Sequence, residues 1–338
     1  MSYQDRINAG LDRAYAAAPV VPIELGQLRL VIISDLHRGA GDDADDFRFS
    51  QHALAAALEH YQRTRWMLAV LGDAEDLWEC EPAEVVAEYR ASLRLEKPFL
   101  DSGRYFRFAG NHDEDWRSAA LVEQYLEPIL GRVGILQALR LEVMERGRRL
   151  GELFLVHGHQ GTLLGERHAW VSEAVLPVLW RPIQRLLNIK TTTPAYSWRL
   201  GRKHELAMHN WAVTRGRVIV IAGHTHHSIF PTPARYAQLS ATYDDLRHQP
   251  EAYGSEELER LEADLAYAAD VHQPCYFNTG CCSFSDGSLT AIEIAGGQVR
   301  LVRWRRPGVT PRRQVLASAR LRQVLSEVAL AGHPMSPS

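Results

Sequence analysis

The chain has 338 residues, of which 46% are hydrophobic and 23% are charged, and its formal net charge is -3. These values are typical of a globular protein with a sizeable core, and they exclude a fibrous or disordered chain. The near-neutral charge also disfavours a dedicated nucleic-acid binder, because such proteins usually carry a clear basic excess.

Short apolar strands recur along the chain up to residue 222, and each of them ends in a cluster of Asp, Asn or His. Helical spacing of apolar residues predicts helices over 49–65, 84–95 and 119–130, and a further strand is predicted over 139–145. Because strand ends converge on one edge of an α/β core, the polar clusters should form a single site. The strands that end in polar clusters are predicted over 28–34, 66–71, 105–109, 152–156 and 218–222.

Two segments interrupt this pattern. Residues 161–217 are helical in pattern and rich in Trp and Arg, so we interpret them as an insertion over the site. Residues 232–274 form a second insertion with an acidic helix predicted over 255–268, and strands follow over 289–294 and 298–304. The predicted organisation is an N-terminal helical extension (1–27), a main domain that contains both insertions (28–306), and a C-terminal helix with a flexible tail (307–338).

Two features of the sequence predict a cytoplasmic protein. Charges interrupt every apolar stretch before it reaches the roughly 20 residues that span a bilayer, and the first residues lack the apolar segment of a secretory signal. The cysteines form no CxxC pair, which favours buried, reduced thiols and a reducing compartment. They are Cys80, Cys275, Cys281 and Cys282.

The polar clusters have the composition of a site for divalent metal ions. They combine carboxylate, imidazole and amide oxygen, a mixture that suits Mn, Fe or Zn, whereas an all-oxygen set suits Ca or Mg and thiolates suit structural zinc. The clusters are Asp35-Leu-His37, Gly72-Asp73, Gly110-Asn111-His112-Asp113, His157-Gly158 and Gly223-His224-Thr225-His226.

This ordered series resembles the calcineurin-like metallophosphoesterases. The match is specific because all five blocks of that family are present in the same order. The resemblance implies an α/β (α+β type) fold: a four-layer sandwich of two mixed β-sheets flanked by helices, with a helical insertion over the active site.

The resemblance further implies two divalent metal ions, with Mn favoured and Fe, Zn or a mixed pair as alternatives. A carboxylate shared between two cations offsets their repulsion, and a bridging water loses a proton near neutral pH, so that hydroxide would attack phosphorus in line. The implied ligands are Asp35, His37 and His226 for one ion, Asn111, His157 and His224 for the other, and Asp73 as the bridge.

Other residues near these blocks have candidate roles. The resemblance implies that His112 contacts the phosphate or protonates the leaving oxygen while Asp113 orients its imidazole, although Asn and Asp there could also simply begin a helix. Arg38 shares a loop with His37 and is a candidate phosphate contact. His159 could support the metal ligands, contact substrate or be a polar loop residue. Glu75 and Asp76 could orient ligands or lie at a solvated helix start.

The expected activity is hydrolysis of a phosphate ester or pyrophosphate in a phosphorylated small-molecule or lipid-linked substrate, as a phosphatase or phosphodiesterase. The residues after Asp73 are not the Asp-Arg-Gly of Ser/Thr protein phosphatases. The Gly-Asp-x-x-Asp-Leu-Trp run ending at Trp78, together with the insertion, resembles the UDP-2,3-diacylglucosamine pyrophosphohydrolases. Those enzymes commonly carry Arg where this chain has His112.

Three further points concern partners. The insertion 161–217 has no transmembrane character but could contact a membrane surface, although the same Trp and Leu spacing is typical of packing. A nuclease would use the basic insertion, and the near-neutral charge disfavours it. A non-catalytic protein-binding platform usually lacks metal ligands, and none is missing here. The sequence does not define an oligomeric state.

Overall fold

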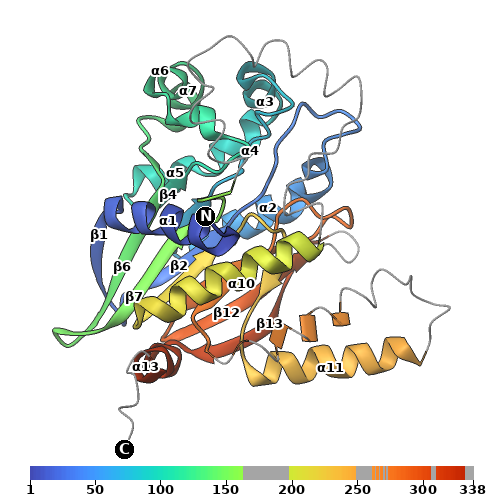
Figure 1. The fold of residues 1–338 in the computed structure, drawn as a ribbon. Coiled ribbons are helices and arrows are strands. Elements are labelled where there is room, and N and C mark those ends of the chain that lie inside the picture. Colours follow the sequence, from blue (N-terminus) through green and yellow to red (C-terminus); the bar gives the residue numbers. More distant parts are fainter. Residues whose placement is uncertain are drawn as a thin grey trace, which may run out of the picture.

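The computed structural model describes residues 1–162, 198–248, 273–305 and 310–331, with the short pieces 261–262, 264–265, 267–268 and residue 271 between them. Two β-sheets form the centre of the molecule, and helices cover them (Figure 1). The predicted fold class, two mixed sheets flanked by helices, is confirmed. Most of the predicted helical insertion 161–217, namely residues 163–197, lies outside the described residues, and its remaining part includes α10 (Trp198–Arg215).

The first sheet has six strands and carries two of the predicted polar strand ends. Its strands pair in parallel except for the β6/β7 and β10/β9 pairs, so the sheet is mixed. The strand order is β1 (Val20–Glu24), β6 (Ala138–Glu145), β7 (Arg148–Val156), β8 (Val218–Ala222), β10 (Tyr276–Thr279) and β9 (Ser228–Ile229).

The second sheet has seven strands and carries the other three polar strand ends. The strands from β2 to β5 are parallel, and β11, β12 and β13 add to them in antiparallel pairs. The strand order is β13 (Arg312–Arg320), β12 (Gln298–Arg305), β11 (Leu289–Ala295), β2 (Arg29–Ile33), β3 (Met67–Leu71), β4 (Tyr105–Phe108) and β5 (Ile135–Leu136).

Alternation along β2 shows how the chain builds its layers. Leu30 and Ile32 belong to the core cluster that contains both sheets, whereas Val31 and Ile33 belong to the cluster beneath the helices on the other face. This is the period of two expected for a strand that is buried on both faces. The outer helices on this side are α2 (Phe47–Arg63), α3 (Pro82–Glu88), α4 (Arg90–Arg94), α5 (Lys97–Asp101), α6 (Ala119–Leu121) and α7 (Glu127–Leu130).

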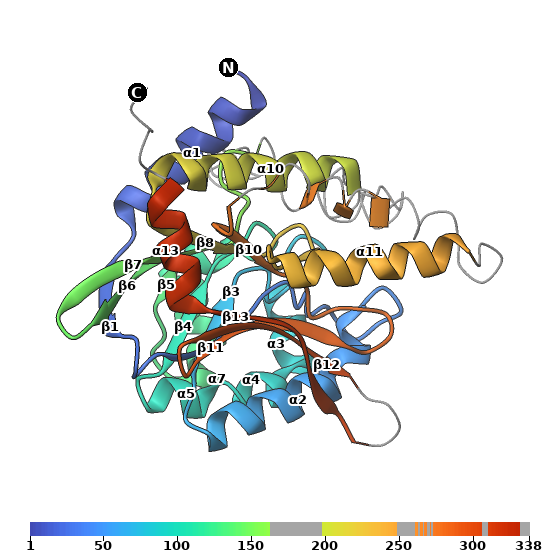
Figure 2. The same ribbon diagram turned by 90° about the horizontal axis from the view of Figure 1, so that it is seen from below.

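Helices also cover the six-stranded sheet, where α1 (Tyr3–Ala17) lies against α10 and β6, and α13 (Leu321–Ala331) packs on β7 and β8 (Figure 2). A capping box between Ser2 and Asp5 begins α1 because each residue satisfies a backbone N–H that the first turn leaves unpaired. In the described part of the chain, every helix is too short or too polar to cross a lipid bilayer.

The structure adds a strand to each terminal segment that was predicted to be helical. Segment 1–27 contains β1, and segment 307–338 contains β13, in addition to their helices. Neither strand has a clear sequence signal, because β1 contains Pro22 and β13 is mostly exposed and rich in Arg. Both features are typical of edge strands, which is where the two strands lie.

Two helix predictions changed in detail, and one helix was not predicted. The helix predicted over 84–95 is divided into α3 and α4, and the one over 119–130 contains a π-helical turn at Val122–Leu126 just before Pro128. In the second insertion, α11 (Pro233–Arg247) was not predicted. Of the helix predicted over 255–268, only 261–262, 264–265 and 267–268 are described, and these residues are helical.

All four cysteines are buried and none forms a disulfide, as the sequence indicated. Burial also raises the pKa of the Cys275 thiol to about 12, so little thiolate forms near neutral pH. We expect the native protein to react very slowly with a thiol reagent such as DTNB. Once the protein is denatured, four thiols per chain should react. Rapid labelling of the folded protein would show that at least one of these thiols is accessible.

Candidate metal centre

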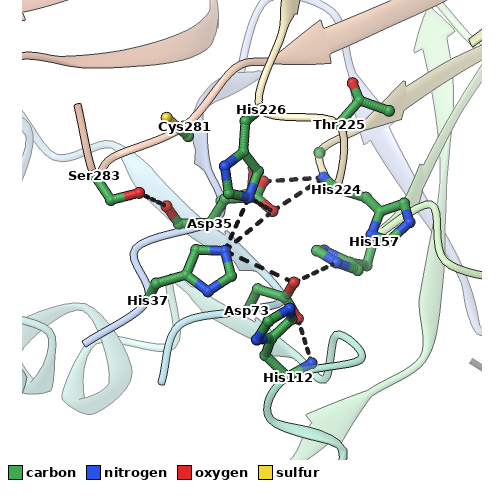
Figure 3. A network of polar contacts seen from close by, with 12 residues as sticks. Asp35, His37, Asp73, His112, His157, His224, Thr225, His226, Cys281 and Ser283 are labelled. Atoms are coloured by element: carbon green, nitrogen blue, oxygen red, sulfur yellow. Dashed lines mark hydrogen bonds and ion pairs between the residues drawn. The ribbon is translucent and has the colours of Figure 1, made fainter. Parts of the chain in front are cut away.

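The predicted polar clusters meet at one place, where strands of both sheets end. Asp35 and His37 follow β2, Asp73 follows β3, and His157 follows β7. His224 and His226 follow β8, and Figure 3 shows these side chains pointing toward one another. These residues therefore lie together at one site, which is the arrangement that the sequence predicts.

The side chains form groups whose spacing fits metal coordination. Asp35, His37 and His226 form one group and Asp73, His157 and His224 another, with candidate ligand atoms within 4.8 Å of one another. His226 Nε2 lies 3.4 Å from Asp35 Oδ1 and 2.9 Å from His37 Nε2. Two atoms that each lie ~2.1 Å from one cation, at an angle of about 90 to 110°, are ~3.0–3.4 Å apart, so these separations suit a shared ion.

Unpaired polar atoms in the same place also fit a cation. Asn111 Oδ1 and His224 Nε2 are buried and have no hydrogen-bond partner among the described residues. His157 Nε2 is also buried, and it faces Asp73 Oδ2 at 3.1 Å. The His157 Nδ1–H donates to the carbonyl oxygen of Leu71 at 2.8 Å, which leaves the Nε2 lone pair free. Buried polar atoms are rarely left without a partner, and metal ions would satisfy these three.

The backbone is strained at the same positions. Among the described residues, eight non-glycine residues have positive φ, and five of them belong to the candidate ligand set. Positive φ is uncommon outside glycine, and such strain gathers at functional sites where the surrounding structure holds it. The five are Asp35 (54°), His37 (50°), Asp73 (49°), His224 (70°) and His226 (58°).

Electrostatics within the cluster favour ionised carboxylates and neutral imidazoles at His37 and His224. At His157 the Asp73 carboxylate outweighs burial and raises the pKa to about 9. Burial alone would raise the pKa of Asp73, but the neighbouring imidazoles of His157 and His112 outweigh it and hold the pKa well below its usual value. Burial, with His157 nearby, lowers the pKa of His224 well below its usual value, and burial lowers that of His37 to about 4. Metal ions bind ionised carboxylates and neutral imidazoles, so a metal at His157 would displace its proton, because a protonated ring nitrogen has no lone pair to donate.

Gly110 permits the β3 and β4 loops to approach each other. A Cβ atom at this position would lie 2.0 Å from Asp73 Oδ1 and 2.5 Å from Asp73 N. We expect Gly110→Ala to displace Asp73, to lower the free energy of unfolding by about 1–3 kcal/mol and to reduce the bound metal. Urea denaturation and elemental analysis measure these effects. Gly134→Ala is the control because a Cβ there meets nothing within 4 Å, and an equal loss in both variants would contradict the prediction.

His112 lies beside the cluster, but Asp113 does not orient it as predicted. Asp76 is the partner of His112, with its Oδ1 3.0 Å from Nδ1, and Trp78 stacks on the ring with centroids 3.9 Å apart. The Asp113 carboxylate instead accepts backbone hydrogen bonds from Gly110 at 2.6 Å and Ala74 at 2.8 Å. The prediction was wrong because these backbone groups, brought close by the fold, occupy the Asp113 oxygens.

Arg38 also differs from its prediction as a phosphate contact. Its side chain is fully buried and forms ion pairs with Glu75 and Glu96, so the guanidinium is not available to a substrate. His159, in contrast, lies next to the cluster, with its ring centroid 5.4 Å from that of His157. His159 Nδ1 has no hydrogen-bond partner among the described residues.

Sequence reasoning missed Asn278, which supports the loop after β8. Its Nδ2 donates to the carbonyl oxygen of Gly223 at 2.6 Å and to Thr225 Oγ1 at 3.1 Å. These contacts fix the backbone between β8 and His226. A signal was present, because the sequence of β10 also ends in polar residues, but the second insertion separates it from the other clusters.

The fold and the site define a class of protein: a hydrolase in which strand ends from two mixed sheets present Asp, His and Asn to divalent metal. The sequence profile described as calcineurin-like phosphoesterase matches residues 28–228, a range that includes every candidate ligand. The chain belongs to the calcineurin-like phosphoesterase family and is a metal-dependent phosphoesterase.

Among solved structures, the chain is similar to Vacuolar Protein Sorting 29 from Cryptosporidium parvum, with 12% identity and a TM-score of 0.33 over 87% of this chain and 98% of that one. Comparison with curated proteins gives no match.

Proposed function

We propose that the centre holds two divalent metal ions and hydrolyses a phosphate ester or pyrophosphate bond. The observation that supports this most directly is the position of Asp73 between the two groups. Its Oδ2 lies 3.1 Å from His157 Nε2 in one group and 3.9 Å from His37 Nε2 in the other. One ion would be held by Asp35, His37 and His226, the other by Asn111, His157 and His224, and both would share Asp73.

Bound divalent ions would supply positive charge to the phosphoryl oxygens and lower the pKa of a water molecule. The chain's own residues would complete the reaction. His112 keeps a fixed orientation because Asp76 binds Nδ1 and Trp78 covers one ring face. Nε2 is therefore the nitrogen available to hydrogen-bond a phosphoryl oxygen or to protonate the leaving oxygen. His159 is a second candidate for contact with substrate.

The test is reconstitution of protein from which metal has been stripped. Mn, Mg, Zn and Fe would be added separately, and hydrolysis would be followed with a phosphomonoester, a phosphodiester and a nucleotide pyrophosphate. We expect Mn to restore activity, with Fe or Zn as alternatives, because all three suit mixed carboxylate, imidazole and amide ligands. The proposal fails if none of the metals restores hydrolysis of any of these bonds.

The panel also separates the candidate substrates. A lipid-linked nucleotide pyrophosphate represents the pyrophosphohydrolases that the run from Gly72 to Trp78 resembles, and small phosphomonoesters and phosphodiesters represent the wider family. In this chain Trp78 stacks on His112, and those pyrophosphohydrolases commonly carry Arg at the position of His112. We therefore place a small phosphorylated substrate first and the lipid-linked pyrophosphate second.

A further inference from the structure

A cavity of about 320 Å³ borders the candidate metal centre at His226. Its walls come from the loop after β8, from α11, from β12 and β13, and from Leu261, Asp264 and Tyr267, so the second insertion builds much of it. Figure 2 shows α11 beside the sandwich on the same side as β12 and β13. The volume lies at the lower end of the ~300–1,000 Å³ range of ligand sites, which suits part of a substrate beside the reacting phosphorus.

The cavity wall carries a cation that forms no ion pair within the described residues, although the Asp264 carboxylate of the same wall acts to raise its pKa. Arg235, in the first turn of α11, donates to the neutral Gln238 at 2.9 Å, and burial lowers its pKa. The other lining arginines differ: Arg202 is paired with Glu205 at 3.1 Å and with Asp264 of the cavity wall, and Arg303 is paired with Asp286 at 2.5 Å. Arg235 is therefore the lining cation best able to bind an oxygen of a ligand.

Aromatic rings form much of the remaining wall. Phe230, Tyr236, Tyr267 and Phe284 line the cavity, and Leu239 of α11 adds an aliphatic surface. The hydroxyl oxygens of Tyr236 and Tyr267 are buried and have no hydrogen-bond partner among the described residues. A site with aromatic walls, two unpaired hydroxyls and one arginine outside any ion pair suits a planar group that carries hydrogen-bond acceptors.

We propose that this cavity binds the non-leaving substituent of the substrate, an aromatic ring with acceptor oxygens, so that the substrate is a phosphodiester or diphosphate and not a simple monoester. The inference rests on the proposed function, because the metal centre at His226 would hold the phosphorus to which the substituent is attached. It assigns to the second insertion the role of choosing among phosphoesters. Both free aryl groups and nucleobases have this aromatic chemistry, and the substrates below distinguish them.

Three p-nitrophenyl phosphodiesters with one common leaving group test the proposal on the Mn-loaded protein. Their second substituents are methyl, phenyl and 5′-thymidine. We expect kcat/KM to be about tenfold higher for the thymidine ester than for the methyl ester, with the phenyl ester between them, since only thymidine offers both a ring and acceptors. Equal values for the three esters would overturn the proposal.

Variants of α11 then locate the effect. Leu239→Trp fills the cavity and should remove the preference for both ring-bearing esters, whereas Arg235→Gln and Tyr236→Phe should lower only the thymidine ester, by about tenfold for Arg235→Gln. Arg247→Gln is the matched control, because it makes the same change at an exposed position of the same helix. An equal loss for all three esters in Leu239→Trp would show that the cavity holds the leaving group, contrary to the proposal.

Binding to metal-stripped protein separates this inference from catalysis. Calorimetric titration with thymidine 5′-monophosphate should give a Kd about tenfold higher for Leu239→Trp and for Arg235→Gln than for the wild type or Arg247→Gln. Identical Kd values, or no binding to the wild type, would overturn the inference. If the proposed function alone is wrong, this difference in binding persists while none of the three esters is hydrolysed.

Discussion

Asp73→Asn is expected to lower kcat for phosphoester hydrolysis by about 10³-fold or more. The Asp73 carboxylate would help to hold the metal ions, and their positive charge is worth several kcal/mol in the transition state. Asp73 Oδ2 is the atom that lies near imidazoles of both groups. The asparagine keeps the shape of the side chain. It also keeps an oxygen that can accept the hydrogen bond from the backbone N–H of His112, which in the wild type lies 2.8 Å from Asp73 Oδ1. Folding should therefore persist while metal content falls.

The measurement pairs activity with elemental analysis and a thermal melt. Asp43→Asn is the matched control, because it makes the same change at a fully exposed carboxylate whose partner is Arg48. This control should retain wild-type activity and metal. Wild-type turnover by a folded Asp73→Asn protein would refute the two-ion assignment, and loss of folding would be recognised by the melt.

Arg107→Met is expected to lower the free energy of unfolding by about 3–5 kcal/mol, because it leaves a buried carboxylate without its cation. Arg107 and Arg38 alternate with Glu75 and Glu96 in a closed ring of ion pairs, and all four side chains are fully buried. The Arg107 Nη1 atom lies 2.9 Å from Glu96 Oε2. The ring connects β4 to the loops that follow β2 and β3, so metal affinity should fall as well.

Urea denaturation measures the effect, and Arg117→Met serves as the control. Arg117 pairs with Glu114 at the surface with half of its side chain exposed, so its loss should cost about 0–1 kcal/mol. Combining Arg107→Met with Glu96→Gln should restore part of the stability, since the double variant again has equal numbers of buried positive and negative charges. A loss for Arg107→Met no larger than for Arg117→Met would contradict the expected role of the ring.

Much of the fold was predictable because its central strands are short, apolar and bounded by polar residues. Predicted strand 28–34 became Arg29–Ile33, and 218–222 became Val218–Ala222, with no change in type. The edge strands β1 and β13 and the helix α11 were not predicted. Their sequences lack a strong apolar period, because they are partly exposed and depend on a neighbouring element for stability.

The sequence by itself determined which residues meet at the candidate centre. Asp35, Asp73 and His224 each follow a buried strand directly or after one glycine, and strand ends of an α/β core lie together whatever the intervening loops do. The local sequence pattern therefore predicts the position of these residues without knowledge of any tertiary contact.

Only the tertiary structure decided how the surrounding charges pair. His112 is 36 residues from its partner Asp76, and Arg38 is 58 residues from Glu96. No local periodicity links such positions, and a charged side chain that looks exposed in sequence can be buried once the fold brings its counter-ion within reach. The cavity at His226 has the same origin, because separate elements form its walls and only their packing creates it.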